Sequence, residues 1–116
     1  AAARRIEREA EASPPEQPAE MVHDSVRVDL AAHRAWVDGE ELDLTATEFR
    51  LLTWLMRHPG RLCTRGELLQ EVWELPPTLN TRTVDTHVKR LRQKLGSAAR
   101  LVETVRGAGY RFAEPG

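Results

Sequence analysis

The stretch "RTVDTHVKRLRQKL", residues 82–95, combines a cluster of positive charge with a regular apolar repeat. It holds five Lys or Arg residues and one acid, in a chain of 116 residues whose formal net charge is −1. At about 100° per residue on a helical wheel, its large apolar side chains fall in one narrow sector: Val84, Val88, Leu91 and Leu95. The pattern predicts a helix that packs this sector on a core and turns a basic, hydrogen-bonding face outward.

The charge is unevenly distributed along the chain. Residues 1–24 and 25–81 each carry a formal charge of −3, from 3 − 6 and 6 − 9. Residues 82–111 carry +6, from eight Lys or Arg residues and two acids. A basic patch on a nearly neutral body attracts a polyanion locally. This distribution favours a nucleic-acid ligand for residues 82–111.

The segments around this helix have patterns of their own. Residues 25–44 alternate apolar and polar side chains and contain "DG" at 38–39, which is typical of a small antiparallel sheet with a tight turn. "TATE" (45–48) and "TRGE" (64–67) have capping-box spacing, each ahead of an apolar stripe, and predict two helices. Residues 101–112 are expected to form two short strands joined at "GAG".

Three helices followed by a basic hairpin are the arrangement of a winged helix-turn-helix in the α+β class, here with an N-terminal antiparallel β-sheet. In such a fold the helix at 82–95 fits a major groove about 12 Å wide. The hairpin at 101–112 can then reach the neighbouring minor groove.

At these residues the sequence resembles the effector domain of the OmpR/PhoB group of bacterial response regulators. The resemblance rests on "LTATEFRLLTWLMRHPGRLCTRGELLQEVW" (44–73), "RTVDTHVKRLRQKL" (82–95) and "VETVRGAGYRF" (102–112), and it extends over about residues 25–116. It implies the DNA-binding part of a two-component transcription factor. The chain departs from the group at Glu74, where many members have glycine after the tryptophan.

The resemblance also assigns roles to individual residues. Thr86 and Arg90 match base-reading positions, and Arg82 matches a contact to a base or a phosphate. The other expected contacts are the backbone contacts His87, Lys89, Arg92, Thr104 and Tyr110, and the minor-groove residue Arg106. Packing against the core remains an alternative for the His87 and Tyr110 rings. Asp85 is expected to orient a neighbouring arginine or the helix start.

The resemblance implies partners as well. An aspartate-phosphorylated receiver domain normally precedes such a domain, so the Pro- and Glu-containing residues 1–24 are expected to be a linker and residues 25–116 the DNA-binding domain. Members commonly bind direct-repeat sites head to tail, so we expect a dimer on DNA and a monomer in isolation. A loop that often contacts RNA polymerase corresponds to Glu74, Leu75, Pro76, Pro77, Thr78, Leu79, Asn80 and Thr81.

Other classes of function have little support in the sequence. The single cysteine, Cys63, is expected to be a buried apolar side chain, and it forms no metal-ligand pattern with the four scattered histidines. No phosphate-binding glycine loop or catalytic triad is evident, so we expect no enzyme and no cofactor. No apolar run could span a bilayer, and a cytoplasmic location is expected. Two alternatives remain open: a winged helix that binds protein, and a DNA-binding domain with a non-receiver input such as a membrane-anchored sensor.

Overall fold

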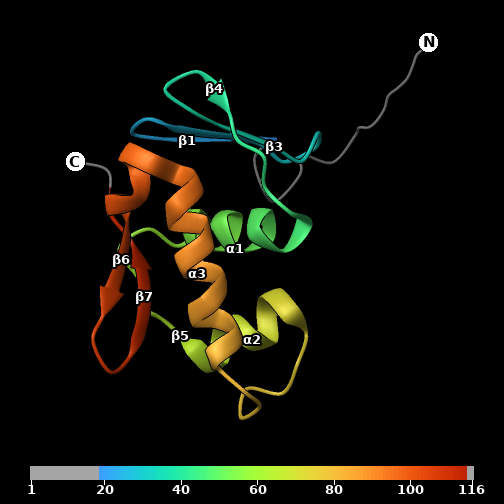
Figure 1. The fold of residues 1–116 in the computed structure, drawn as a ribbon, viewed down its shortest axis with the longest axis vertical. Coiled ribbons are helices and arrows are strands. Elements are labelled where there is room, and N and C mark those ends of the chain that lie inside the picture. Colours follow the sequence, from blue (N-terminus) through green and yellow to red (C-terminus); the bar gives the residue numbers. More distant parts are fainter. Residues whose placement is uncertain (1–18, 115–116) are drawn as a thin grey trace.

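The N-terminal part of the molecule is a four-stranded antiparallel sheet. The computed structural model describes residues 19–114. Strands β1 (Glu20–His23), β2 (Val26–Asp29), β3 (Arg34–Val37) and β4 (Glu40–Glu41) follow one another in the order β1-β2-β3-β4. The sheet lies across one end of the helices (Figure 1).

The register of this sheet follows from the alternation in the sequence. Val26 and Val28 of β2 are fully buried, and Ala35 and Val37 of β3 are buried as well, while the residues between them are more exposed. The "DG" turn after β3 has positive φ at both residues, 52° and 83°, as a tight hairpin turn requires.

The N-terminal sheet begins before residue 25, where the sequence places the start of the DNA-binding domain. Strand β1 begins at Glu20 and pairs with β2 in full register, so the last residues of the expected linker, 1–24, belong to the sheet. The remainder of the linker prediction concerns residues 1–18, which lie outside the described residues.

Helices α1 (Ala46–Arg57) and α2 (Arg65–Trp73) begin where the capping motifs place them. Thr45 forms the complete box: its hydroxyl accepts from the Glu48 amide at 3.1 Å, and the Glu48 carboxylate accepts from the Thr45 amide at 2.9 Å. At α2 the box forms in one direction only. The Thr64 hydroxyl accepts from the Glu67 amide, whereas the Glu67 carboxylate pairs with Arg61.

Helix α3 spans Arg82–Leu95, the range expected from the sequence. Its four apolar sector residues are all buried, as predicted: Val84, Val88, Leu91 and Leu95. Near its C-terminal end the Lys94 ammonium donates to the buried Glu48 carboxylate at 2.6 Å, which ties α3 to the start of α1. A 3-10 helix, η1 (Gly96–Leu101), which the sequence did not predict, then leads into the hairpin.

The C-terminal hairpin consists of β6 (Val102–Val105) and β7 (Gly109–Phe112). A short strand before α2, β5 (Cys63–Thr64), extends it to a three-stranded sheet of order β5-β7-β6. A side chain at Gly109 would collide with the Cys63 carbonyl, so glycine is needed where these two strands meet. Cys63 itself is fully buried, as expected, and its thiol is free.

The two sheets and three helices enclose one hydrophobic core. In Figure 1, α3 lies between the hairpin on one side and α1 and α2 on the other. This is the α+β winged helix-turn-helix predicted from the sequence, with β6 and β7 as the wing. Among residues 19–114, no helix is both long and apolar enough to cross a membrane.

Candidate nucleic-acid interface

The exposed cations of residues 19–114 fall into two groups. Seven exposed Arg or Lys side chains form ion pairs with carboxylates: Arg27, Arg34, Arg50, Arg61, Lys94, Arg100 and Arg111. Within residues 19–114, the exposed cations that have no such partner are Arg82, Lys89, Arg90 and Arg106. All four lie on α3 or at the tip of the wing. Because no carboxylate offsets them, their charge is available to an anionic ligand.

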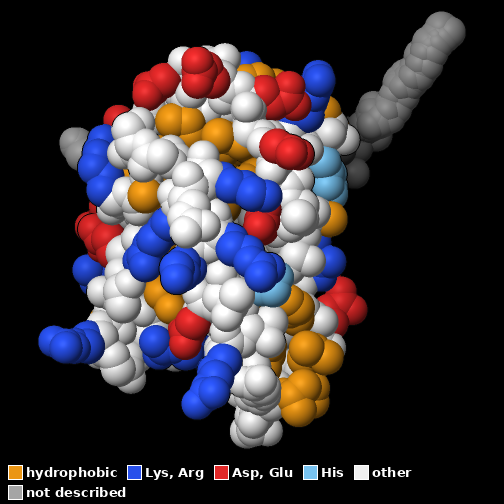
Figure 2. Space-filling model, viewed as in Figure 1, with side chains coloured by type: hydrophobic (Ala, Val, Ile, Leu, Met, Phe, Trp, Pro, Cys, Tyr) orange, Lys and Arg blue, Asp and Glu red, His pale blue; other side chains and the backbone are white. Residues whose placement is uncertain are grey.

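Figure 2 shows the same division on the molecular surface. Lys and Arg side chains gather over α3 and the wing, whereas Asp and Glu side chains gather over the N-terminal sheet. Figures 1 and 2 share one view, so the basic face is the one on which α3 is the foremost helix. An outward α3 and an adjacent wing with unpaired cations suit a ligand whose negative charge repeats along its length.

The start of α3 is held by a side chain from the preceding loop. The Asn80 carbonyl oxygen accepts from the Arg82 amide at 3.0 Å, while Thr81 at the N-cap makes no side-chain cap bond. The Arg82 guanidinium has no carboxylate partner among the described residues. Thr86, Lys89 and Arg90 are exposed further along the helix and have no side-chain partner among the described residues.

His87 occupies an intermediate position. Its Nδ1 donates to the Thr83 carbonyl at 2.8 Å, and its ring packs edge-on against Trp73 with centroids 5.0 Å apart. The ring is half-buried, which agrees with the packing alternative. Since Nδ1 donates within the helix, only Nε2 remains for any contact with a ligand.

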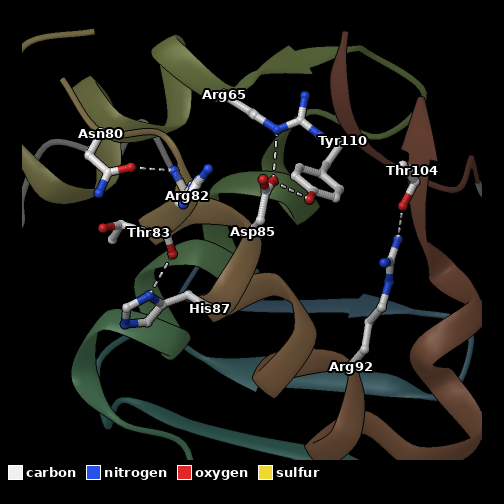
Figure 3. A network of polar contacts seen from close by, with 9 residues as sticks. All are labelled: Arg65, Asn80, Arg82, Thr83, Asp85, His87, Arg92, Thr104 and Tyr110. Carbon is white, nitrogen blue, oxygen red and sulfur yellow. Dashed lines mark hydrogen bonds and ion pairs between the residues drawn. The ribbon is translucent and has the colours of Figure 1, made fainter. Parts of the chain in front are cut away.

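Arg92 is engaged by the wing. Its Nε and one terminal nitrogen both donate to the Val102 carbonyl, at 3.0 and 2.6 Å, and the same terminal nitrogen donates to the Thr104 hydroxyl at 2.7 Å. Figure 3 shows this side chain reaching from α3 to β6. The geometry makes Arg92 a tie between α3 and the wing, although the resemblance suggested a phosphate contact.

Asp85 joins three elements. Its carboxylate accepts from Arg65 Nε of α2 at 2.7 Å and from the Tyr110 hydroxyl of β7 at 2.5 Å (Figure 3). Burial opposes ionisation of Asp85, but the Tyr110 and Arg65 hydrogen bonds outweigh it and hold its pKa below the ordinary value. Asp85 therefore orients an arginine, as predicted.

Tyr110 belongs to the core, and the same cluster binds its polar end. The residue is 5% exposed, in agreement with the core alternative, and its hydroxyl donates to Asp85. Burial and the adjacent Asp85 carboxylate raise the Tyr110 pKa. Two guanidiniums lie over its ring, Arg65 at 5.4 Å and Arg92 at 5.6 Å from the centroid.

Arg65 was missed by the sequence reasoning. Its partner Asp85 lies 20 residues away along the chain, and no local pattern around "TRGE" indicates the pairing. The hydrogen bond to Asp85 is the main cause that raises the Arg65 pKa. A faint signal exists in the acidic Asp85 within an otherwise basic helix, since a buried or half-buried acid needs a partner.

The tip of the wing carries Arg106 into solvent. The turn closes with a bond from the Ala108 amide to the Val105 carbonyl at 2.9 Å, and Gly107 has a φ of 74°, which glycine adopts readily. Arg111, on the following strand, pairs with Glu103 at 2.9 Å. Arg106 is therefore the uncompensated cation at this end of the interface.

The loop between α2 and α3 is exposed and apolar. Leu75 and Leu79 are 37% and 51% exposed, and the two prolines between them are exposed as well. Glu74, at the end of α2, has a φ of 56°, a left-handed conformation that favours glycine. This conformation accounts for the glycine that many members of the resembling group carry at the same position.

Known transcriptional regulators resemble this chain in sequence and in fold. Residues 39–112 match the family described as "Transcriptional regulatory protein, C terminal". The phosphate regulon transcriptional regulatory protein PhoB of Pseudomonas aeruginosa is 46% identical over 87 residues, which is 74% of this chain and 38% of that protein. The chain thus spans under two-fifths of the length of this relative.

Two solved structures show the likeness in three dimensions. The DNA-binding domain of CpxR from E. coli is 32% identical with a TM-score of 0.76, over 86% of this chain and all of that one. The DNA-binding domain of RstA from Klebsiella pneumoniae, solved in complex with its RstA box, is 29% identical with a TM-score of 0.74, over 81% and 96%.

Proposed function

The chain belongs to the OmpR/PhoB family of transcriptional regulators and corresponds to their C-terminal DNA-binding domain, and on this premise we propose how it engages DNA. Helix α3 enters the major groove, and the wing enters the adjacent minor groove. The observation that carries the proposal is the coincidence of all unpaired exposed cations with these two elements within residues 19–114. The RstA domain, a structural neighbour, is solved with its DNA box.

The free side chains divide into those that recognise bases and those that bind the DNA backbone or the minor groove. Arg90 is exposed on α3, and a guanidinium can meet guanine O6 and N7 with two bonds. Lys89 is a flexible point charge suited to a phosphate. Thr86 presents a methyl and a hydroxyl to a base edge, and Arg82 contacts a base or a phosphate at the helix start. Arg106 enters the minor groove, where a narrow A·T-rich segment concentrates negative potential.

The remaining predicted residues make different contributions. Arg92 and Thr104 hold the wing against α3, and the Tyr110 ring supports both from the core. His87 approaches DNA only through Nε2. These residues shape the interface more than they bind DNA.

The whole protein extends this proposal. A receiver domain precedes the chain in the intact regulator and controls it by aspartate phosphorylation in the cytoplasm. Two copies bind direct-repeat sites head to tail, and the exposed apolar loop 74–81 contacts RNA polymerase. Support for the loop contact comes from Leu75 and Leu79, which the free domain leaves exposed on either side of two prolines.

The test combines a salt titration with a selection of binding sites. For about four to six neutralised phosphates, the slope of log affinity against log salt should be about −4 to −5. Arg90→Ala should cost about 1–3 kcal/mol on the preferred site and relax the base preference at one position. Lys89→Ala should weaken all sequences nearly equally and make the slope about one unit shallower.

Arg34→Ala is the matched control, because Arg34 is exposed on the N-terminal sheet and pairs with Glu41. It should change neither the slope nor the selected motif. A slope near zero for the parent domain would overturn the DNA proposal and leave the protein-binding alternative. An unchanged motif for Arg90→Ala would remove Arg90 from the base readers.

A further inference from the structure

A hollow lies on the face of α1 that is turned away from α3. The side chains that α1 contributes to it have i, i+3, i+4, i+7 spacing and so share one helix face: Arg50, Thr53, Trp54 and Arg57. At about 100° per residue, Arg57 lies about 180° from Glu48, whose carboxylate binds Lys94 of α3. In Figure 1, α3 crosses in front of α1. The hollow is therefore separate from the surface that the proposed function gives to DNA.

The hollow has the size of a small aromatic molecule. Its volume is about 230 Å³, and an apolar cavity of roughly 150 Å³ is enough for benzene. One wall is a pair of rings, because His33 of the β2–β3 turn stacks on Phe49 with centroids 4.7 Å apart and planes 19° apart. Trp54 of α1 and Val72 of α2 add further apolar surface. A flat apolar ring can therefore pack against aromatic and aliphatic side chains here.

Arg57 brings a positive charge to the hollow without an acceptor of its own. Within residues 19–114 its guanidinium forms no ion pair and no hydrogen bond, and its Nε is buried. A buried N–H that has lost water and gained no acceptor is unfavourable. An anion on the terminal nitrogens would stabilise the whole delocalised cation, including its buried end.

The other charged side chains of the hollow are Arg50 and Glu71. Arg50 is already engaged, because it donates to the Val72 carbonyl and pairs with Glu74 at 3.9 Å. Glu71 is exposed and forms no ion pair among the described residues. The formal charge of the lining is +1, from 2 − 1 with histidine neutral. The hollow therefore favours an anion over a cation, and Arg57 is the donor that remains available.

We propose that this hollow binds a small aromatic carboxylate. The ring packs against Phe49 and Trp54, and the carboxylate accepts two parallel bonds from the terminal nitrogens of Arg57, the geometry that a guanidinium fork prefers. The site is independent of how α3 and the wing sit on DNA. Arg50 links it to the start of loop 74–81, through its bonds to Val72 and Glu74.

Benzoate is the probe, and three matched compounds separate its features. Benzamide keeps the ring and loses the charge, acetate keeps the carboxylate and loses the ring, and benzylammonium reverses the charge. The dissociation constant for benzoate should be about 1 mM or lower, which ligands of this size can reach. Each matched compound should bind about tenfold more weakly or worse, because it lacks either the charge-assisted hydrogen bonds or the buried ring.

The measurement is an NMR titration at constant ionic strength. The indole Nε1–H signal of Trp54 and the amide signals of Phe49 and Val72 should shift and saturate with benzoate. Thermal melts establish that each variant below is folded.

Four variants test the charged groups. Arg57→Ala should weaken benzoate binding about tenfold, and Arg57→Lys, which keeps the charge but not the fork, should recover part of the loss. Glu71→Gln removes a like charge and should tighten binding about twofold, for a separation of about 8 Å in water. Arg34→Ala, on the N-terminal sheet, is the matched control and should bind benzoate like the parent.

DNA binding supplies a second readout. Since the hollow faces away from α3, fluorescence anisotropy should give the same DNA affinity in benzoate and in chloride of equal ionic strength. A loss of DNA affinity specific to benzoate, or shifts confined to α3 and the wing, would place the carboxylate on the DNA interface and refute the site.

Other outcomes overturn the proposal directly. Equal affinity for benzoate and benzamide, or equal affinity of the parent and Arg57→Ala for benzoate, excludes the contact with Arg57. The absence of a saturable shift up to about 10 mM benzoate, tenfold above the expected constant, excludes the site. None of these outcomes depends on DNA, so they leave the proposed function untouched.

Discussion

Replacement of Arg92 by alanine should weaken the fold, with little direct effect on phosphate binding. The guanidinium makes two bonds to the Val102 carbonyl and one to the Thr104 hydroxyl. Hydrogen bonds to charged donors contribute about 1.5–3 kcal/mol, and we apply this range to the group as a whole, because Arg92 is half-exposed and water replaces part of it. A domain of this size loses about 4–8 °C in melting temperature for each kcal/mol.

The assay pairs thermal denaturation with the salt dependence of DNA binding. Arg92→Ala should lower the melting temperature and leave the salt slope within about half a unit of the parent. Arg92→Lys retains the charge but cannot make the forked bond to Val102, so its melting temperature should fall nearly as far. Lys89→Ala, from the exposed face of the same helix, should do the reverse: an unchanged melt and a shallower slope.

One result would refute this reasoning about Arg92. If Arg92→Ala melts like the parent and its slope is about one unit shallower, the side chain leaves the wing and binds a phosphate, as the sequence alone suggested. The bonds seen to Val102 and Thr104 would then describe the free domain only.

Two further predictions concern stability. Leu91 is fully buried in the middle of the apolar sector of α3, so Leu91→Ala should cost about 2–5 kcal/mol in a chemical-denaturation experiment; an unchanged midpoint would mean that another face of α3 meets the core. Glu48 and Asp85 both have lowered pKa values: burial opposes ionisation, but bonds from Lys94 and Thr45 to Glu48, and from Tyr110 and Arg65 to Asp85, outweigh it. A depressed folded-state pKa contributes stability that is present above the unfolded value of about 4 and lost as the pH falls through the folded one. Melting temperatures should therefore fall below about pH 4, and Glu48→Gln should flatten that fall. Burial also lowers the pKa of His58, so a separate loss of stability is expected as the pH falls from about 7 to 5.

The parts of the fold that the sequence predicted are those with a complete local signal. Helix α3 has both a buried sector and a basic face, and its bounds were predicted to the residue. Strand β5 has two residues and no period of its own, since it exists only by pairing with β7 across the Gly109 contact. Strand β1 was missed because its residues follow a Pro- and Glu-containing segment that masks their pairing with β2.

The sequence predicted which side chains of the candidate interface are exposed, but not which of them form hydrogen bonds within the domain. Arg82, Lys89, Arg90 and Arg106 were expected to face outward and contact DNA, and they are exposed without acidic partners among residues 19–114. The long side chain of Arg92 could reach outward or back to the wing, and helical position alone does not decide between the two. Its partner Val102 follows η1, an element that no sequence pattern predicts.

The distinction between paired and unpaired cations also explains how one short basic segment both folds and binds DNA. Cations that meet a fixed acceptor, such as Lys94 on Glu48 and Arg92 on Val102, contribute to the stability of the free domain. Unpaired like charges on one face repel each other and contribute nothing favourable until an anion arrives. Substitutions of paired cations should therefore change stability, and substitutions of unpaired cations should change affinity.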